Sequence, residues 1–320
     1  MLPEVLDTLS PRAGEIYVDG TFGNGGYTQA FLEATECSVV ALDRDPTVRT
    51  QAAVLSEKYG ERFRLIQTSF SKMDELGIGQ VDAVALDIGV SSTQIDQGER
   101  GFSFQKSGPL DMRMSQSGAT AAEAVAELPQ AELEHVFRVY GEEKHARRAA
   151  RLVVRAREEN AIATTDGLAD LLERGLGRKG RIHPATRVFQ ALRIFINDEL
   201  GELYEGLCAA ERILKPGGRL IAVTFHSLED RIVKTFMRQR CGGGQSGSRY
   251  TPVAKKPPVQ PSFEVTRRSV LKPSEKEVTK NARSRSARLR WALRTNAEPI
   301  ADEYSPLRKF PRLQNYGWAA

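Results

Sequence analysis

Three aspartates stand where a parallel sheet would bind a ligand. Asp19, Asp43 and Asp87 each close a short apolar run, and a glycine-rich stretch, residues 20–26, joins the first of them to a helical segment. Glycines let a ligand approach the backbone closely. Asp43 suits a ribose diol, because a carboxylate accepts hydrogen bonds from two hydroxyl groups at once. Since strand ends meet at one edge of a sheet, these groups predict a single site.

The glycine-rich stretch discriminates between two cofactors. A dinucleotide would need G-x-G-x-x-G with its pyrophosphate on a helix N-terminus, whereas this stretch reads D-G-x-x-G-x-G-G and Asp19 would repel a pyrophosphate. S-adenosylmethionine has no phosphate and carries cationic amino and sulfonium groups, which carboxylates attract. The residues favour S-adenosylmethionine, with S-adenosylhomocysteine as product and with Gly23 among the glycines that bind it. Ordinary turn and cap roles remain the alternative.

The stretch after Asp87 reads I-G-V-S-S-T-Q and could hold a reacting amine. An exocyclic amine of a base is a weak nucleophile, because its lone pair is delocalised into the ring. The Asp87 carboxylate and a nearby carbonyl could align it, with Ser91 and Ser92 in the same loop, which is proximity catalysis more than strong base catalysis. The Pro-Pro-aromatic element of many amino-methyltransferases is absent, so cofactor binding is the alternative role of Asp87.

The elements that must position these residues indicate an α/β fold. Near-continuous apolar runs alternate with helical patterns, which is typical of a parallel sheet covered on both faces. The expected strands are residues 15–19, 37–42, 63–66, 81–86, 219–225, 263–270 and 287–294. The expected helices beside them are residues 27–34, 46–58 and 228–240, and a mobile loop is expected at 241–261.

A helical insertion separates the fourth and fifth of these strands. The gap from Asp87 to Arg219 far exceeds a simple crossover, and a structureless loop of that length is implausible. Helical patterns occur at residues 121–128, 130–139, 142–158 and 165–176, and Pro184 opens a long helix expected to return the chain to the sheet. The prediction is a discontinuous domain, residues 1–100 and 200–320, with a helical substrate-recognition domain at 101–199.

The amino-acid composition limits the classes of protein to which the chain can belong. The 320 residues are 27% charged and 40% apolar, as in a folded globular protein. No apolar run is long enough to cross a membrane. Three scattered cysteines match neither a disulfide framework nor a zinc site, so we expect a reducing, cytoplasmic location and no metal.

The charge is unevenly distributed along the chain. Residues 231–320 hold 20 Lys and Arg against 6 Asp and Glu, whereas residues 1–230 are net negative. This pattern indicates a polyanionic partner, with a solubilising tail as the alternative. Within the basic segment the residues expected to contact RNA phosphates are Arg283, Arg285, Arg288 and Arg290. A second cluster, Lys144, Arg147, Arg148, Arg151, Arg155 and Arg157, fits a phosphate-binding surface and a solvated surface equally well.

Three further features lie near the expected site. Phe70 follows the third strand and could stack on adenine or belong to the core. His226 follows the fifth strand and could contact the target nucleotide, while Ser227 and Asp230 fit a helix cap and its first turn. Residues 100–114 predict a loop over the site, with packing between domains as the alternative.

Eight motifs in order along the chain resemble one family. They are D-G-T-F-G-N-G-G at 19–26, D-R-D-P at 43–46, L-D-I-G-V-S-S at 86–92, E-R-G-F-S-F at 99–104, G-P-L-D-M-R-M at 108–114, H-P-A-T-R at 183–187, F-H-S-L-E-D-R at 225–231 and R-S-R-S at 283–286. Together they resemble the bacterial small-subunit ribosomal RNA methyltransferase H family, also called MraW, across nearly the whole chain.

The resemblance implies a class I, Rossmann-like S-adenosylmethionine-dependent methyltransferase with a helical insertion. It implies methyl transfer to N4 of a cytidine in the decoding region of 16S ribosomal RNA. The cofactor contacts that it implies are Gly25, Gly26, Tyr27, Asp43, Phe70, Asp87 and Gln94. Tyr27 stands where many members have histidine. Selecting one nucleotide requires recognition of RNA shape, which favours the assembled small ribosomal subunit as substrate.

Two other functions share parts of this pattern. A DNA amino-methyltransferase would use the same cofactor site but is expected to carry the Pro-Pro-aromatic element. A non-enzymatic ribosome-assembly factor would keep a vestigial pocket, against which the three intact strand-end acids count.

Overall fold

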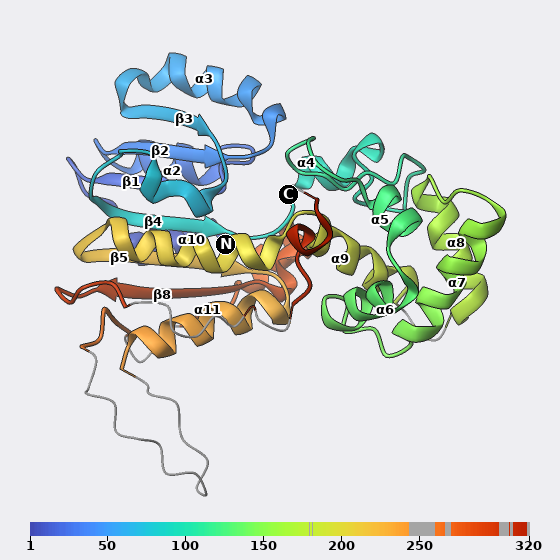
Figure 1. The fold of residues 1–320 in the computed structure, drawn as a ribbon. Coiled ribbons are helices and arrows are strands. Elements are labelled where there is room, and N and C mark those ends of the chain that lie inside the picture. The colour runs from blue at the N-terminus through green and yellow to red at the C-terminus, as the bar shows by residue number, and fades with distance from the viewer. Residues whose placement is uncertain are drawn as a thin grey trace, which may run out of the picture. The chain divides into compact units, whose positions relative to one another are not determined.

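The computed structural model describes residues 1–178, 180, 182–242, 260–265, 270–300, 307 and 310–318. It divides into two compact units: Met1–Gly89 with Glu202–Pro306, which contains the sheet, and Val90–Gly201 with Leu307–Ala320, which is helical (Figure 1). The sequence-based boundaries at residues 101 and 200 differ from these, and the C-terminal residues group with the helical unit. Most of the loop expected at 241–261 lies outside the described residues.

A mixed β-sheet forms the centre of the first unit. Its strands are β1 (Ile16–Asp19), β2 (Ser38–Asp43), β3 (Phe63–Gln67), β4 (Val81–Asp87), β5 (Leu214–Thr224), β6 (Phe263–Glu264), β7 (Val270–Leu271) and β8 (Arg288–Arg294). In the described residues the order is β3-β2-β1-β4-β5-β8-β6, with β7 paired to β8. Strands β1 to β5 are parallel, and β8 is antiparallel to its neighbours. The predicted Rossmann-like α/β fold is confirmed, with its topological switch point between β1 and β4.

Helices cover both faces of this sheet. On one face, α1 (Leu2–Leu9), α2 (Gly26–Ala34) and α3 (Arg49–Tyr59) join a buried apolar cluster with alternate strand residues such as Val39 and Val223. On the other face lie α10 (Glu199–Ile213) and α11 (Ser227–Arg240), where the rings of Tyr204 and Phe236 meet edge to face. Successive side chains of a strand point to opposite faces of the sheet, so each strand contributes side chains to both apolar layers, as a sheet covered on both faces requires.

The arginine face of β8 points toward the helices. Nε of Arg290 lies 2.7 Å from Oδ1 of Asp230 in α11, and the Arg294 guanidinium donates to the backbone oxygens of Glu211 and Ser262. Arg290 is only 8% exposed. The expectation that Arg290 contacts RNA is therefore wrong, because its charge is neutralised inside the fold. Period-2 spacing identifies a face of a strand but not what covers it.

Two elements have boundaries in the structure that differ from those predicted from the sequence. Strand β5 begins at Leu214 rather than Arg219, and the pairing with β4 shifts register where the predicted breaker, residues 215–218, enters the strand. The long helix expected from Pro184 is two helices, since α9 (Ala185–Ile196) ends before α10 begins. Asp198 lies between them with a φ of 44°, which interrupts the helical path.

The second unit is a bundle of helices. They are α4 (Ser92–Asp96), α5 (Ala121–Glu127), α6 (Gln130–Val139), α7 (Ala146–Glu159), α8 (Thr165–Leu176) and α9. The C-terminal segment packs into this unit, because Phe310 stacks on Tyr140 and the Tyr140 hydroxyl donates to the Pro311 carbonyl. Of the helices described, none is long and apolar enough to cross a lipid bilayer.

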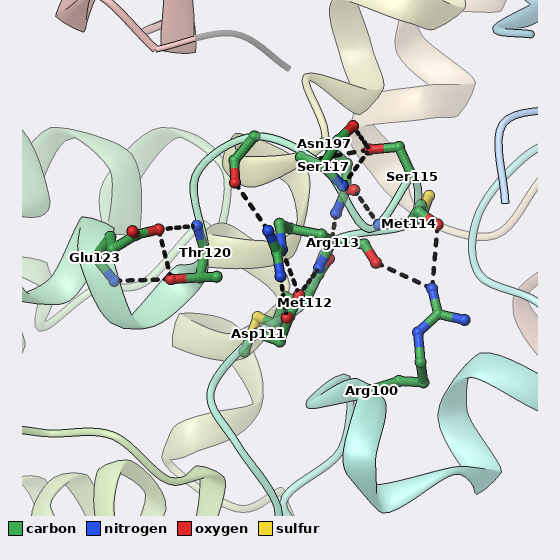
Figure 2. Close-up of polar contacts among 11 residues, drawn as sticks. Arg100, Asp111, Met112, Arg113, Met114, Ser115, Ser117, Thr120, Glu123 and Asn197 are labelled. Carbon is green, nitrogen blue, oxygen red and sulfur yellow. Dashed lines mark hydrogen bonds and ion pairs between the residues drawn. The ribbon is translucent and has the colours of Figure 1, made fainter. Parts of the chain in front are cut away.

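Buried hydrogen bonds hold the loop at residues 100–114, as Figure 2 shows. Arg100 donates to the carbonyls of Arg113 and Met114, and the Asn197 side chain donates to the Met112 carbonyl and accepts from the Met114 amide. Met112 has a φ of 63°, a conformation that costs about 1–2 kcal/mol for a residue with a side chain. These contacts make the loop a fixed part of the helical unit.

The Asp230→Ala substitution is expected to lower the free energy of unfolding by about 3–5 kcal/mol, because it leaves the buried Arg290 charge without its partner. The control is Arg288→Ala, which removes a half-exposed cation 3.2 Å from the same carboxylate and should cost less than about 1 kcal/mol. Urea denaturation followed by circular dichroism measures both. Equal losses from the two variants would contradict the buried-pair interpretation.

Candidate functional site

The three aspartates end three neighbouring strands. Asp19 ends β1, Asp43 ends β2 and Asp87 ends β4, and β1 pairs with both of the other strands. All three strands run parallel, so the carboxylates gather at one edge of the sheet beside the switch point. The prediction that these acids close successive strands is confirmed.

Asp19 builds the glycine-rich loop. It is fully buried, and its two carboxylate oxygens accept from the Thr21 amide at 3.2 Å and the Thr28 hydroxyl at 2.7 Å. Thr28 lies in the first turn of α2, so this carboxylate joins strand, loop and helix. Burial raises the pKa of Asp19 to about 6, which the two hydrogen bonds partly oppose.

Asp43 holds the loop from the neighbouring strand. Its Oδ2 accepts from the Gly23 amide and its Oδ1 from the Asp45 amide, each at 2.8 Å. Burial raises the pKa of Asp43 above its usual value. A carboxylate has about four acceptor positions, so two remain for the hydroxyl groups of a ligand.

Asp87 has an oxygen to spare. Its backbone amide donates to the Thr21 hydroxyl at 2.7 Å. Its Oδ1 is buried without a hydrogen-bond partner in the described part of the chain. Burial, with repulsion from Asp19, raises the pKa of Asp87 to about 7. Burial also raises the pKa of Tyr27 well above its usual value. A buried unpaired acceptor is costly, so this atom is suited to a cationic or hydrogen-bond-donating ligand.

Two adjacent glycines play different parts. Gly25 has a φ of 76°, and a Cβ there would lie 2.9 Å from Leu55, so the fold itself requires glycine. At Gly26, the first residue of α2, a Cβ would meet nothing within 4 Å. The fold thus leaves open space at the start of the helix, where backbone amides can receive an anionic group.

Phe70 packs against a helix of the sheet unit. It follows β3, and its ring lies so close to Gly206 of α10 that a Cβ there would be 2.3 Å from the ring. The side chain is half-buried. This packing fixes the ring and is compatible with stacking on an adenine, which stays a prediction.

Three predicted residues belong to the second unit. Ser91 caps α4, its hydroxyl accepts from the Gln94 amide, and the Gln94 side chain accepts from the Ser91 amide. Ser92 is the first residue of that helix. The capping box explains the local sequence, and the roles of these residues toward cofactor or amine stay predictions.

His226 lies at the start of α11. Nε2 of its ring is 2.8 Å from Oε1 of the fully buried Glu229, whose Oε2 accepts from the backbone amides of Phe225 and His226. The helix cap is therefore His226 rather than Ser227, and Asp230 pairs with arginines of β8 instead of serving only the helix dipole. Contact of His226 with a nucleotide stays a prediction.

The remaining predicted RNA contacts lie on the surface. Arg283 and Arg285 are exposed in the short helical turn Ala282–Ser286, and the Arg288 side chain is half-exposed beside Asp230. Their contact with RNA stays a prediction.

Sequence reasoning assigned no role to Thr21, Thr28 or Glu229, which orient the loop and the start of α11. The only signal available was their position. Thr21 lies inside the glycine-rich stretch, and Glu229 stands three residues after the cap residue, which is capping-box spacing.

A family model and named relatives match this chain over almost its whole length. The model of the MraW methylase family matches residues 1–295. The ribosomal RNA small subunit methyltransferase H of Maricaulis maris is 53% identical over 311 residues, covering 95% of this chain and 93% of the relative. The protein of the same name from Caulobacter vibrioides is 55% identical, covering 93% and 95%.

Solved structures resemble the chain more weakly. An rRNA methylase from Streptococcus thermophilus is 11% identical with a TM-score of 0.40, over 91% of this chain and 92% of that one. The sequence matches decide the assignment, because they extend over almost the entire length of both proteins at half identity or more. The chain belongs to the MraW methylase family.

Proposed function

We propose that this protein transfers a methyl group from S-adenosylmethionine to N4 of a cytidine in the decoding region of 16S ribosomal RNA. The observation that carries the proposal is 53% identity, over 95% of the chain, to a relative named ribosomal RNA small subunit methyltransferase H. The assembled small subunit is the proposed substrate, and the helical unit is the proposed recognition domain.

The residues of the loop fit the cofactor. The open space at Gly26 and the start of α2 suit the carboxylate of the methionine part, and Asp43 retains acceptors for the ribose hydroxyls. The spare Oδ1 of Asp87 suits a cationic group. When bound, S-adenosylmethionine supplies an electrophilic methyl group on a positively charged sulfur.

Asp87 is the group best placed to act on the target amine. Its carboxylate can accept a hydrogen bond from the N4 amine and align the nitrogen lone pair with the methyl group. As the new N–C bond forms, the amine nitrogen becomes acidic and must release a proton. The Asp87 carboxylate, whose pKa burial raises to about 7 in the protein without cofactor, can receive that proton.

The activity test uses S-adenosylmethionine with a labelled methyl group and small subunits that lack the modification. After digestion to nucleosides, label is expected in N4-methylcytidine. Asp87→Ala should reduce transfer by at least about a hundredfold while the protein stays folded, because it removes the amine acceptor. The control is Glu57→Ala, which removes an exposed acid of α3 and should leave transfer unchanged.

Each other outcome has a definite meaning. Label at another RNA atom would refute the N4 assignment, and label only in DNA would favour the DNA amino-methyltransferase. Cofactor binding without any transfer would favour the assembly factor. Near-normal transfer by Asp87→Ala would refute the role of that residue.

Substitutions at the two adjacent glycines distinguish an effect on folding from an effect on cofactor binding. Gly26→Ala should leave the free energy of unfolding unchanged within about 0.5 kcal/mol, yet weaken S-adenosylmethionine binding at least tenfold, because its methyl group enters the open space. Gly25→Ala should lower the free energy of unfolding by about 1–2 kcal/mol, because it forces a side chain into positive φ. Denaturant titration and calorimetric binding measure the two effects. Unchanged affinity in Gly26→Ala would place the cofactor elsewhere.

Cofactor affinity should rise with pH through about 7. Below that value Asp87 is largely protonated, and a neutral carboxyl attracts the sulfonium weakly. S-adenosylhomocysteine shares the amino acid and the nucleoside but lacks the sulfonium charge, so its affinity should rise less over the same range. Calorimetry at three pH values compares them, and Asp87→Asn should remove the difference. Parallel pH profiles for both compounds would contradict a sulfonium contact.

A further inference from the structure

A row of cations lies unpaired along one face of the helical unit. It consists of Lys144, just before α7, and Arg147, Arg148, Arg151 and Arg155 within the helix; we call it the α7 row. All five side chains are exposed, and in the part of the chain that the structure describes none forms an ion pair or a hydrogen bond.

The opposite face of α7 fixes the row in place. Its small residues, including Ala149 and Val153, are buried, and Leu152 approaches α8 so closely that a Cβ on Gly175 would clash with it. Arg157 has a different role from the row, because it donates to the carbonyls of Val125 and Leu128 at the end of α5. The packed face therefore holds the helix against its neighbours with the row exposed to solvent, and the exposed acids of the helix, Glu158 and Glu159, lie at its C-terminal end.

The row works against the stability of its own helix. Arg147, Arg151 and Arg155 follow one another at intervals of four residues, where like charges repel. Arg147 and Arg148 also lie in the first turn, which itself holds no acidic residue and where the helix dipole is positive. Solvent and salt screen both penalties, and an anionic partner would replace them with favourable contacts.

We propose that the α7 row binds the phosphate backbone of RNA, an inference that rests on the proposed function and deepens it. The four arginines span about 12 Å of the helix axis, and guanidinium groups bind phosphate oxygens in a bidentate manner. A protein partner would ordinarily need an apolar anchor, but no exposed large apolar side chain of the described residues lies on α7. The row positions the RNA and does not read its sequence.

The test measures binding of a fluorescently labelled small-subunit ribosomal RNA transcript to the full-length protein over a range of KCl concentrations. Arg151→Ala/Arg155→Ala should reduce the slope of log affinity against log salt by about 1.4–1.8 and weaken binding by roughly 25-fold or more at about 0.1 M KCl. In the methylation assay the same variant should raise KM and keep kcat, since these contacts do not touch the reacting atoms.

The matched control is Arg12→Ala/Arg64→Ala, which removes two exposed arginines of the sheet unit. Arg12 precedes β1 and Arg64 is the second residue of β3, so both lie toward the sheet edge opposite to the strand-end acids. This variant has the same net charge as the test variant and should keep the wild-type slope.

An unchanged slope for the α7 variant, or an equal change in the control, would overturn the inference. Loss of binding to an acidic polypeptide such as polyglutamate, with RNA binding intact, would assign the row to a protein partner instead. Failure of the proposed function is a separate result, because it appears as absence of N4-methylcytidine with the unmodified protein and does not affect the binding slopes.

Discussion

The buried carboxylate of Asp19 holds a strand end, the glycine-rich loop and helix α2 in one arrangement. Removing a carboxylate from water is costly, and here the cost is offset by two hydrogen bonds to the segment that must be shaped. Asp43 does the same from the next strand, through the Gly23 amide. Two acids therefore build the loop, whereas Asp87 keeps one buried oxygen that has no hydrogen-bond partner among the described residues. The three strand-end residues are all aspartates but have different roles: Asp19 and Asp43 shape the loop, and Asp87 is available to a ligand.

Arginine serves two opposite purposes in this protein. Inside the sheet unit, Arg290 and Arg294 are buried with Asp230 and with backbone oxygens, where a planar guanidinium satisfies several acceptors at once. The four arginines of the α7 row have no such partners among the described residues and face solvent. The net charge of the C-terminal segment therefore overestimates the number of arginines that it exposes to a polyanion. The net charge of the insertion underestimates the number that α7 exposes.

The parallel sheet and its strand-end acids were predictable, because buried apolar runs and the residue that ends each run are local properties of the sequence. The face that Arg290 occupies was not, since alternation does not reveal which layer covers a strand. The cap of α11 was misplaced for a related reason: Ser227 has the better cap chemistry, but Glu229 binds the backbone one residue earlier. The entry of residues 215–218 into β5 depends on pairing with β4, which no local pattern reports.

The position of the insertion affects how the sheet forms during synthesis. Strand β4 is complete at Asp87, but its partner β5 begins only at Leu214. At a ribosome speed of about 5–20 residues per second, the roughly 130 intervening residues take about 6–25 s to appear. Throughout that time the apolar β4 has an open edge, which is the kind of edge that promotes aggregation. The part of the helical unit before Gly201 is therefore made while the sheet is still incomplete, whereas Leu307–Ala320 joins that unit only at the end of synthesis.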